Sequence, residues 1–275
     1  MTTNFDINAL AFLLSQAAEV EIRPRFRALA DGEVRVKTSA IDLVTEADEA
    51  AERFIKAGMD AILPGALFVG EESVAADPAL LPKLAEADLA VVIDPIDGTF
   101  NFAAGVPLFG VMASVVAGGE TIAGVIYDPM GDDFVLAEKG AGAWQTGGNR
   151  PAVRLKAAAP VDLKDMTGMA STGFLSPEKR AGVMANLAKV AFASNYRCAA
   201  HEYRTFAAGH VHYLMYNKLM PWDHLAGTLI SQEAGAHAAR FDGSAYEPRH
   251  LEGGLLLAPD RESWEMMRRE VFVVD

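Results

Sequence analysis

The stretch VVIDPIDGTFNF, residues 91–102, decides the fold. An apolar run leads to Asp94, Pro95 turns the chain, and Asp97 follows three residues after the first acid. A buried strand that ends in two carboxylates is costly to fold, because uncompensated buried acids must be neutralised or must recruit a cation. The stretch therefore predicts the floor of a metal site at the end of a buried strand.

The composition predicts a globular protein with a large core. Of the 275 residues, 51% are hydrophobic and 22% are charged, which suits one large domain or two packed subdomains. The formal net charge of -13 argues against a nucleic-acid or anionic-lipid surface, but allows an anionic substrate if metal ions supply positive charge. With one cysteine, Cys198, and neither a leader pattern nor a long apolar run, we expect a soluble cytoplasmic protein.

The first half of the chain predicts helices followed by an antiparallel meander. Helical spacing of apolar residues favours a helix that Pro24 ends or kinks, and Thr45 to Asp48 has the pattern of a capping box at a second helix. Predicted helices cover residues 8–29 and 45–63, residues 77–87 form a loop or short helix, and strands cover 34–37, 66–69, 89–93, 108–116, 121–127 and 134–138.

From about residue 150 the pattern alternates between helix and strand, which is typical of a layered α/β unit. Strands are expected at 166–171, 211–216, 236–241 and 255–258, and helices at 176 onward, 202–209, 221–234 and 260–270. We therefore expect an N-terminal α+β subdomain over residues 1–150, with most of the metal ligands, and a C-terminal α/β subdomain over residues 151–275.

Acids stand at the ends of several predicted elements: Glu71, Asp94, Asp97 and Asp223. Carboxylate oxygens are the ligands that Mg²⁺ prefers, and no Cys/His cluster has the spacing of a zinc site. Each acid also has an ordinary interpretation, since Glu71 could belong to a polar loop and Asp223 could cap a helix.

Gly98 and Thr99 suit the start of a helical turn, whose free N–H groups can hold phosphate. Carboxylates beside such a turn are what metal-assisted phosphate hydrolysis needs. Haloacid-dehalogenase phosphatases use a shorter Asp-x-Asp-Gly-Thr motif near the N-terminus, so the three-residue step from Asp94 to Asp97 argues against that family.

Four segments together resemble the inositol monophosphatase family, in order and in spacing: DLVTEAD at 42–48, GEES at 70–73, DPIDGTFNF at 94–102 and WDHLAG at 222–227. The resemblance implies a layered α-β-α-β-α sandwich, an α+β or α/β fold, that forms a homodimer. It also implies two or three Mg²⁺ ions at one site and a small phosphorylated substrate.

The resemblance also assigns roles to residues of this chain. By position, the metal ligands are Glu71, Asp94, the carbonyl of Ile96, Asp97 and Asp223. Glu71 and Thr99 orient the attacking water, the N–H groups of Gly98 and Thr99 bind phosphate, and Asp97 and Asp223 complete the substrate site. Lys37, Asp42 and Asp48 fall near the mobile part of the metal site, although alone the first two read as surface charges and Asp48 as a helix cap.

Three positions depart from the pattern of the family members that act on inositol phosphates. Tyr216 replaces a glutamate, Phe100 replaces a small or polar residue, and Arg197-Cys198 stands where Gly-Ser or Gly-Thr is usual. Arg197 either binds a second anionic group of the substrate or pairs with Glu202 or another acid. We therefore expect that inositol phosphate is not the sole or best substrate.

The sequence thus predicts a Mg²⁺-dependent phosphomonoesterase that acts on a small sugar or polyol phosphate through a metal-activated water. The alternatives are histidinol phosphate, fructose 1,6-bisphosphate or a 3′-phosphonucleotide as substrate. From another class, the chain could be a non-catalytic factor in transcription or RNA maturation, a hypothesis that the retained acids disfavour.

Overall fold

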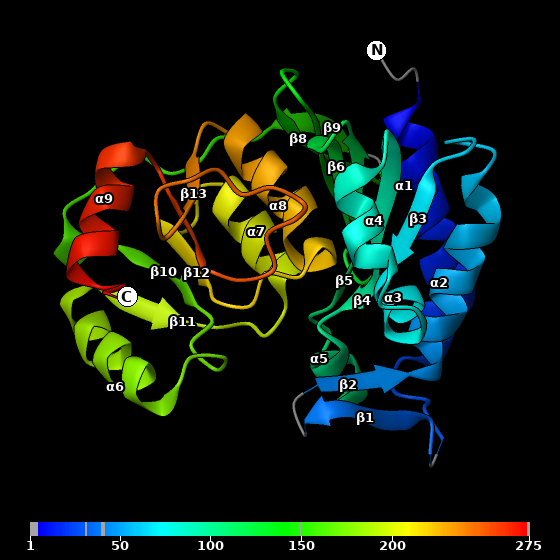
Figure 1. Ribbon diagram of the computed structural model, residues 1–275, viewed down its shortest axis with the longest axis horizontal. Coiled ribbons are helices and arrows are strands. Elements are labelled where there is room, and N and C mark those ends of the chain that lie inside the picture. The colour runs from blue at the N-terminus through cyan, green and yellow to red at the C-terminus, as the bar shows by residue number, and fades with distance from the viewer. Residues whose placement is uncertain (1–4, 31, 40–41, 149, 274–275) are drawn as a thin grey trace.

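The protein is built in five layers, α-β-α-β-α, as the family resemblance implied (Figure 1). The computed structural model describes residues 5–30, 32–39, 42–148 and 150–273, with backbone only at residues 37–39 and 42. Among the described residues, no helix combines the length and the apolar character needed to cross a bilayer.

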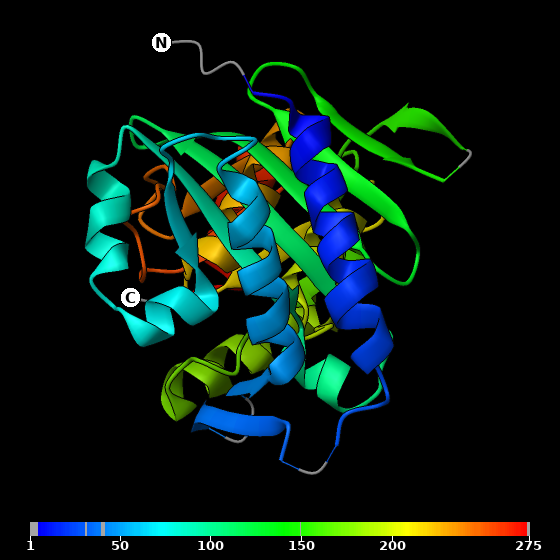
Figure 2. The ribbon, with the colours of Figure 1, turned by 90° about the vertical axis from the view of Figure 1, so that its right-hand side faces the viewer.

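A seven-stranded sheet forms the larger half, in the order β3-β4-β5-β6-β7-β8-β9. Helices α1 (Ile7–Ala17) and α2 (Glu46–Met59) lie side by side across one face of it, as Figure 2 shows. The strands are β3 (Leu67–Gly70), β4 (Leu89–Asp97), β5 (Gly110–Ala117), β6 (Glu120–Asp128), β7 (Asp133–Glu138), β8 (Ala143–Gly147) and β9 (Arg150–Arg154). Their pairing is antiparallel from β4 to β9, which confirms the predicted meander.

Helices α7 (Ala199–Ala207) and α8 (Pro221–Glu233) form the middle layer, against the other face of this sheet. The backbone of α8 approaches β6 so closely that a Cβ at Gly124 would lie 2.9 Å from backbone atoms of Ala226. Because α8 packs so closely against β6, its first turn, which contains Asp223, lies beside β4 of the large sheet.

A second sheet in the order β11-β10-β12-β14-β13 follows, with helices α6 (Pro177–Asn186) and α9 (Arg261–Glu270) outside it. Its strands are β10 (Thr167–Ala170), β11 (Phe192–Ser194), β12 (Tyr213–Tyr216), β13 (His237–Arg240) and β14 (Leu255–Ala258). The small sheet of β1 (Val34–Ser39) and β2 (Asp42–Thr45) lies beside the short helix α5 (Thr99–Ala103).

Several elements differ from the sequence prediction. The helix expected over 8–29 changes at Ala17 to a π-helical turn (Ala18–Ile22) and then a 3-10 turn (Arg23–Arg25) that contains Pro24. The helix expected to end at residue 63 ends at Met59. Strands β2, β8, β9 and β11 and helix α3 (Glu71–Ala76) lie in segments for which loops, edges or no element were expected. Helix α4 (Leu80–Glu86) agrees with the short helix that was one alternative for residues 77–87.

Candidate metal centre

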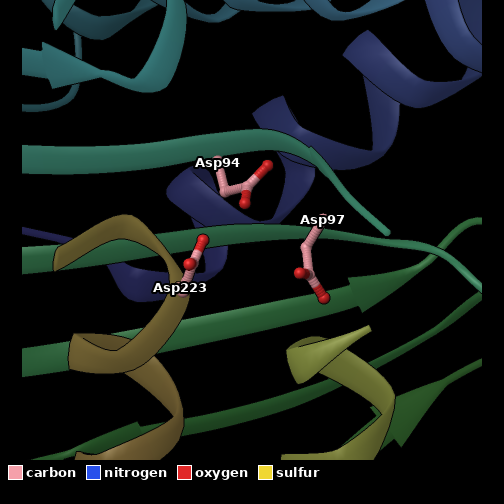
Figure 3. Close-up of side chains that lie close together, drawn as sticks. All are labelled: Asp94, Asp97 and Asp223. Carbon is pink, nitrogen blue, oxygen red and sulfur yellow. The ribbon is translucent and has the colours of Figure 1, made fainter. Parts of the chain in front are cut away.

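Three aspartates from two distant parts of the chain meet at the end of β4. Asp94 and Asp97 come from β4 and Asp223 from the first turn of α8, and one carboxylate oxygen of each lies within 4.8 Å of the others (Figure 3). The structure therefore brings together three of the four acids that the sequence singled out.

A bulge in β4 makes this arrangement possible. Side chains three residues apart on a regular strand point to opposite faces of the sheet. Here Asp94 pairs with Met112 and Asp97 with Gly110, so three steps on β4 match two on β5. The extra residue of such a bulge turns the strand locally and lets both carboxylates reach the same site.

The three carboxylates form no ion pair with a described lysine or arginine, although the charge of Lys218 acts on Asp223. Asp94 and Asp97 are 2% and 9% exposed, and no Lys or Arg of the described residues forms an ion pair with Asp94, Asp97 or Asp223. Burial, followed by the charges of neighbouring acids, raises the pKa of Asp94 and Asp223 well above its usual range. Burial also raises the pKa of Asp97 to about 6. Buried oxygen ligands in this electrostatic state fit a hard divalent cation.

Hydrogen bonds orient the two carboxylates of β4. The Ile96 N–H donates to Asp94 Oδ1 at 3.0 Å. Asp97 Oδ2 accepts from the Ala200 N–H at 2.6 Å and from the Cys198 thiol at 3.0 Å, which ties β4 to the start of α7. The thiol is buried and its pKa is raised by burial, so Cys198 acts here as a neutral hydrogen-bond donor.

Glu71 lines the same cavity as the three aspartates and is the first residue of α3. The start of α3 is fixed by Glu52 of α2, a residue that the sequence reasoning missed. The Glu52 carboxylate, 4% exposed, accepts the N–H groups of Glu72 at 2.7 Å and Ser73 at 2.8 Å. A Cβ at Gly70 would collide with that carboxylate, so the glycine allows the cap. The sequence contained one signal for this role, since Glu52 is an acid on the apolar face of α2.

Thr99 joins Asp48 to the metal-site loop. The Thr99 hydroxyl lies 3.1 Å from Asp48 Oδ1 and 2.9 Å from the Ile96 carbonyl, and its one proton can serve one of these acceptors at a time. Asp48 also accepts the Thr45 N–H at 2.8 Å, which confirms the predicted capping box. Burial raises the pKa of Asp48 to about 7. Asp48 is therefore both a helix cap and a neighbour of Thr99.

Gly98 adopts the left-handed conformation, with φ of +87°, directly before α5. A Cβ there would lie 3.1 Å from the Cβ of Cys198 and from the Leu108 carbonyl oxygen. Both the backbone angle and the close approach require glycine. The helical turn predicted to start at Gly98-Thr99 is confirmed.

The wall of the cavity, which has a volume of about 390 Å³, carries the residues that depart from the family pattern. The Arg197 guanidinium stacks on the Phe100 ring, 3.3 Å from its centroid, and forms no ion pair with any described acid. The Glu202 carboxylate instead accepts the Tyr196 N–H at 2.8 Å, so pairing with Glu202, one of the two alternatives for Arg197, is not what the structure shows. Burial raises the pKa of Glu202 to about 7. The buried Tyr216 hydroxyl faces the Glu202 carboxylate, and burial, followed by that charge, raises the pKa of this hydroxyl well above its usual range.

Lys218 and His224 also line the cavity. Lys218, which the sequence reasoning did not single out, lines it with its ammonium 5.4 Å from the Phe174 ring centroid. His224 donates from Nε2 to the Lys218 carbonyl at 2.9 Å, and burial lowers the pKa of this imidazole to about 4. His224 is therefore neutral and structural. The side chains of Lys37 and Asp42 lie outside the described part of the structure.

Comparison with known proteins gives one consistent result. The model of the inositol monophosphatase family matches residues 5–271. The chain is 32% identical over 219 residues to the fructose-1,6-bisphosphatase/inositol-1-monophosphatase of Thermotoga maritima, covering 76% of each chain. It is also 32% identical over 226 residues to the Nus factor SuhB of Vibrio cholerae, covering 79% of this chain and 78% of that one.

Solved structures agree with this match. The extragenic suppressor protein suhB of Bartonella henselae superposes with a TM-score of 0.80 at 25% identity, covering 96% of this chain and 97% of the other. The layered fold is thus that of an already known architecture.

Proposed function

The chain belongs to the inositol monophosphatase family, a family of phosphatases, and we propose that it is a Mg²⁺-dependent phosphomonoesterase that hydrolyses a small sugar or polyol phosphate. The observation that carries the proposal is the group of three carboxylates at Asp94, Asp97 and Asp223, none of which forms an ion pair with a described lysine or arginine. A cluster that is costly in the bare protein is explained if cations join it during function.

In this proposal two or three Mg²⁺ ions are held by Glu71, Asp94, the Ile96 carbonyl, Asp97 and Asp223. Bound ions would supply positive charge for the phosphoryl oxygens and acidify a water molecule. The chain's own contribution is orientation, since the bonds from Ile96, Cys198 and Ala200 hold the carboxylates in place before the substrate arrives.

We propose that Glu71 and Thr99 position the attacking water, while the N–H groups of Gly98 and Thr99 hold the phosphate. Asp48 supports this role because it is within hydrogen-bond distance of the Thr99 hydroxyl. The water oxygen forms the new bond to phosphorus, and the substrate oxygen leaves as an alcohol after taking up a proton. No phosphorylated side chain is formed on this route.

The substrate site contains a cation and a phenol hydroxyl. Arg197, which stacks on Phe100 and pairs with no described acid, can bind a second anionic group. The Tyr216 hydroxyl, which faces Glu202 at the wall of the cavity, can bind a substrate hydroxyl. We therefore propose a substrate with hydroxyls and a second anion, such as fructose 1,6-bisphosphate, in preference to inositol phosphate alone. Histidinol phosphate and a 3′-phosphonucleotide are the alternatives.

A phosphate-release assay tests both levels of the proposal. The panel contains inositol 1-phosphate, fructose 1,6-bisphosphate, histidinol phosphate and a 3′-phosphonucleotide, each with Mg²⁺ and with EDTA. We expect turnover that EDTA abolishes, with fructose 1,6-bisphosphate ahead of inositol 1-phosphate. Equal turnover with EDTA would refute the metal-dependent mechanism, and a clear preference for inositol 1-phosphate would refute the substrate choice.

A non-catalytic role in transcription or RNA maturation is the second candidate, because one relative is named a Nus factor. The net charge of -13 favours a protein partner over direct RNA contact in that role. In a strain that depends on this chain, replacing it by the Asp94→Asn variant separates the two. If the variant loses phosphatase activity and also fails to support the strain, the result supports catalysis. If the variant loses activity but still supports the strain, the result supports the binding role.

We further propose that residues 1–150 and 151–275 act as two subdomains that form the site between them, in a cytoplasmic homodimer. Support comes from the strands, since the large sheet ends at Arg154 and the second sheet begins at Thr167. Asp223 then reaches the cluster from the second subdomain.

A further inference from the structure

Arg197 has an unusual backbone conformation at the wall of the cavity that contains the acidic cluster. Its φ is +55°, in the left-handed region, which is unfavourable for any residue with a Cβ and which glycine adopts freely. Among the described residues, two other non-glycine residues have a positive φ, Arg27 and Asp132, and neither lines this cavity. Strain of this kind persists only where the surrounding structure imposes it, and it is concentrated at functional sites.

Hydrogen bonds on both sides of Arg197 impose this conformation. The Tyr196 carbonyl accepts from Asn101 Nδ2 at 2.8 Å, and the Tyr196 N–H donates to the Glu202 carboxylate at 2.8 Å. The Arg197 N–H donates to Asn195 Oδ1 at 2.8 Å. Asn101 and Glu202 are 6% and 2% exposed, so their bonds are shielded from water. Two buried side chains therefore hold the loop that carries Arg197.

Helix α5 holds the side chain of Arg197 as well as the backbone beside it. Phe100 and Asn101 are consecutive residues of α5. The Phe100 ring supports the guanidinium, and the Asn101 amide bonds the Leu108 carbonyl at 2.9 Å in addition to that of Tyr196. A guanidinium that rests on a ring keeps the N–H groups at its edge for other partners. Arg197 is exposed and pairs with no described acid, so these donors remain for a ligand in the cavity.

The loop of Arg197 is also tied to the proposed metal centre. Cys198, the next residue, donates its thiol to Asp97 Oδ2 at 3.0 Å. The Ala200 N–H donates to the same oxygen at 2.6 Å. The guanidinium of Arg197 is therefore fixed in relation to the acids at which the phosphate would react.

We propose that Arg197 is a specificity-determining residue that binds the distal anionic group of the substrate, and that Asn101 is a positioning residue that acts through it. This inference rests on the proposed function, because it concerns the substrate of the same site. A cation fixed near the metal centre favours a substrate with two anionic groups, such as a sugar bisphosphate, over the corresponding monophosphate. The strained backbone then serves to keep the guanidinium in place.

Equilibrium binding of two substrate analogues tests the role of Arg197 without hydrolysis. Both are fructose derivatives with a phosphonate at C1, in which a methylene replaces the ester oxygen, and only one of them carries a phosphate at C6. Calorimetric titration in Mg²⁺ should give the wild type at least about tenfold higher affinity for the analogue with the second anion. Arg197→Gly should lower this affinity ratio about tenfold. A wild-type ratio near one, or an unchanged ratio in the variant, would overturn the proposal.

The stability of two variants tests the strain at Arg197. Arg197→Gly and Arg197→Ala both remove the guanidinium and its contact with Phe100, but only glycine relieves the left-handed backbone. We therefore expect the melting temperature in EDTA to be higher for Arg197→Gly than for Arg197→Ala, by about 2 °C. A lower melting temperature for Arg197→Gly would contradict the strain on which the proposal is built.

A double-mutant cycle tests the role of Asn101. Alone, Asn101→Ala should lower the affinity ratio about fivefold, because it releases the loop at Tyr196. In the Arg197→Gly background the same substitution should leave the ratio unchanged, since Asn101 acts through Arg197. Asn101→Ser, which can still donate to one carbonyl, should give a smaller change in the same direction. An unchanged ratio in Asn101→Ala, or the same fractional loss in both backgrounds, would overturn the assignment of Asn101.

Arg154→Ala is the matched control. Arg154 also lies over an aromatic ring, 5.8 Å from the centroid of Trp144, but on β9 and outside the cavity. Its affinity ratio should equal that of the wild type, because long-range charge is screened. A loss as large as that of Arg197→Gly would mean a general effect of charge and would overturn the proposal.

Phosphate release in Mg²⁺ separates a failure of this inference from a failure of the proposed function. If no sugar phosphate is hydrolysed, the proposed function is rejected, while the affinity ratio of the two analogues still decides the role of Arg197. If hydrolysis occurs but Arg197→Gly leaves the affinity ratio unchanged, the role of Arg197 is rejected and the proposed hydrolysis stands.

Discussion

Two clusters of buried acids on the large sheet are compensated in opposite ways. At the turn between β6 and β7, Asp133 is 4% exposed and pairs with Arg204 and with Arg150, the latter at 3.2 Å. Gln145 donates to the same carboxylate at 2.7 Å. At the end of β4, Asp94 and Asp97 are similarly buried but lie beside Asp223, and none of the three forms an ion pair with a described lysine or arginine.

The difference separates a structural use of charge from a functional one. The charge of Asp133 is balanced by two arginines of the same chain, and these ion pairs tie β7 to α7 and β9. The acids at the end of β4 have raised pKa values, and we infer that their negative charge is balanced only when a cation binds. Substitutions at the two clusters should therefore affect different properties of the protein.

The largest expected effect is on catalysis. Asp94→Asn keeps an oxygen that can accept the Ile96 N–H but removes the charge, so kcat should fall about a thousandfold, or about 4 kcal/mol in the barrier. Asp133→Asn, the matched change at the other cluster, should retain most of its activity per folded molecule. Steady-state phosphate release measures both. Similar losses in the two variants would remove the distinction between the clusters.

The next effect is on stability and concerns the other cluster. Arg204→Met leaves Asp133 buried with only the exposed Arg150 as a cationic partner, so the free energy of unfolding should fall by about 3 kcal/mol. Urea denaturation in EDTA measures this loss. A change below about 0.5 kcal/mol would mean that the ion pair is as weak as a surface pair.

The pH dependence of the metal-free protein sharpens the comparison further. The pKa values of Asp48 and Asp97, about 7 and about 6, are raised above those of the unfolded chain. Their contribution to stability is therefore complete at low pH and is lost as the pH rises through 6 to 7. We expect the free energy of unfolding in EDTA to fall by about 2 to 4 kcal/mol from pH 5 to pH 8.

Urea denaturation at several pH values tests this slope, and Mg²⁺ should reduce it because the ions bind the ionised carboxylates. A stability that rises over this range without metal would contradict the assignment of uncompensated acids.

The smallest expected effect comes from Glu52. Glu52→Gln leaves one carbonyl oxygen where two carboxylate oxygens held the start of α3, so Glu71 should be less well positioned. We expect kcat/KM to fall about tenfold, or about 1.4 kcal/mol. Glu49→Gln on the same helix, which breaks only the surface pairs with Arg35 and Arg53, is the control. If Glu52→Gln and the wild type have equal kcat/KM values, the cap from Glu52 does not position the catalytic site.

Local sequence patterns predicted the elements that carry the site. The strands from β4 to β7, the start of α8 and the turn at Gly98 follow from apolar runs, proline and glycine, which act over a few residues. The acids at their ends were predicted to act together, because buried carboxylates are costly unless they bind a cation. Three of them lie together in the structure.

Contacts between distant residues could not be predicted in this way. The bulge between Asp94 and Asp97 depends on pairing with β5, and the cap from Glu52 on the packing of α2 beside α3. The stacking of Arg197 on Phe100 depends on a loop that reaches across the cavity, so the sequence left two partners for Arg197 open. Each of these features is set by tertiary structure.

Mn²⁺ binding, measured by electron paramagnetic resonance, tests the central claim most directly, because Mn²⁺ replaces Mg²⁺ at oxygen sites and is itself detected. The account predicts saturable binding by the wild type, at least about tenfold weaker binding by Asp94→Asn and by Asp223→Asn, and wild-type binding by Asp133→Asn. Undiminished Mn²⁺ affinity in the Asp94 and Asp223 variants would contradict the claim that these carboxylates form the metal centre.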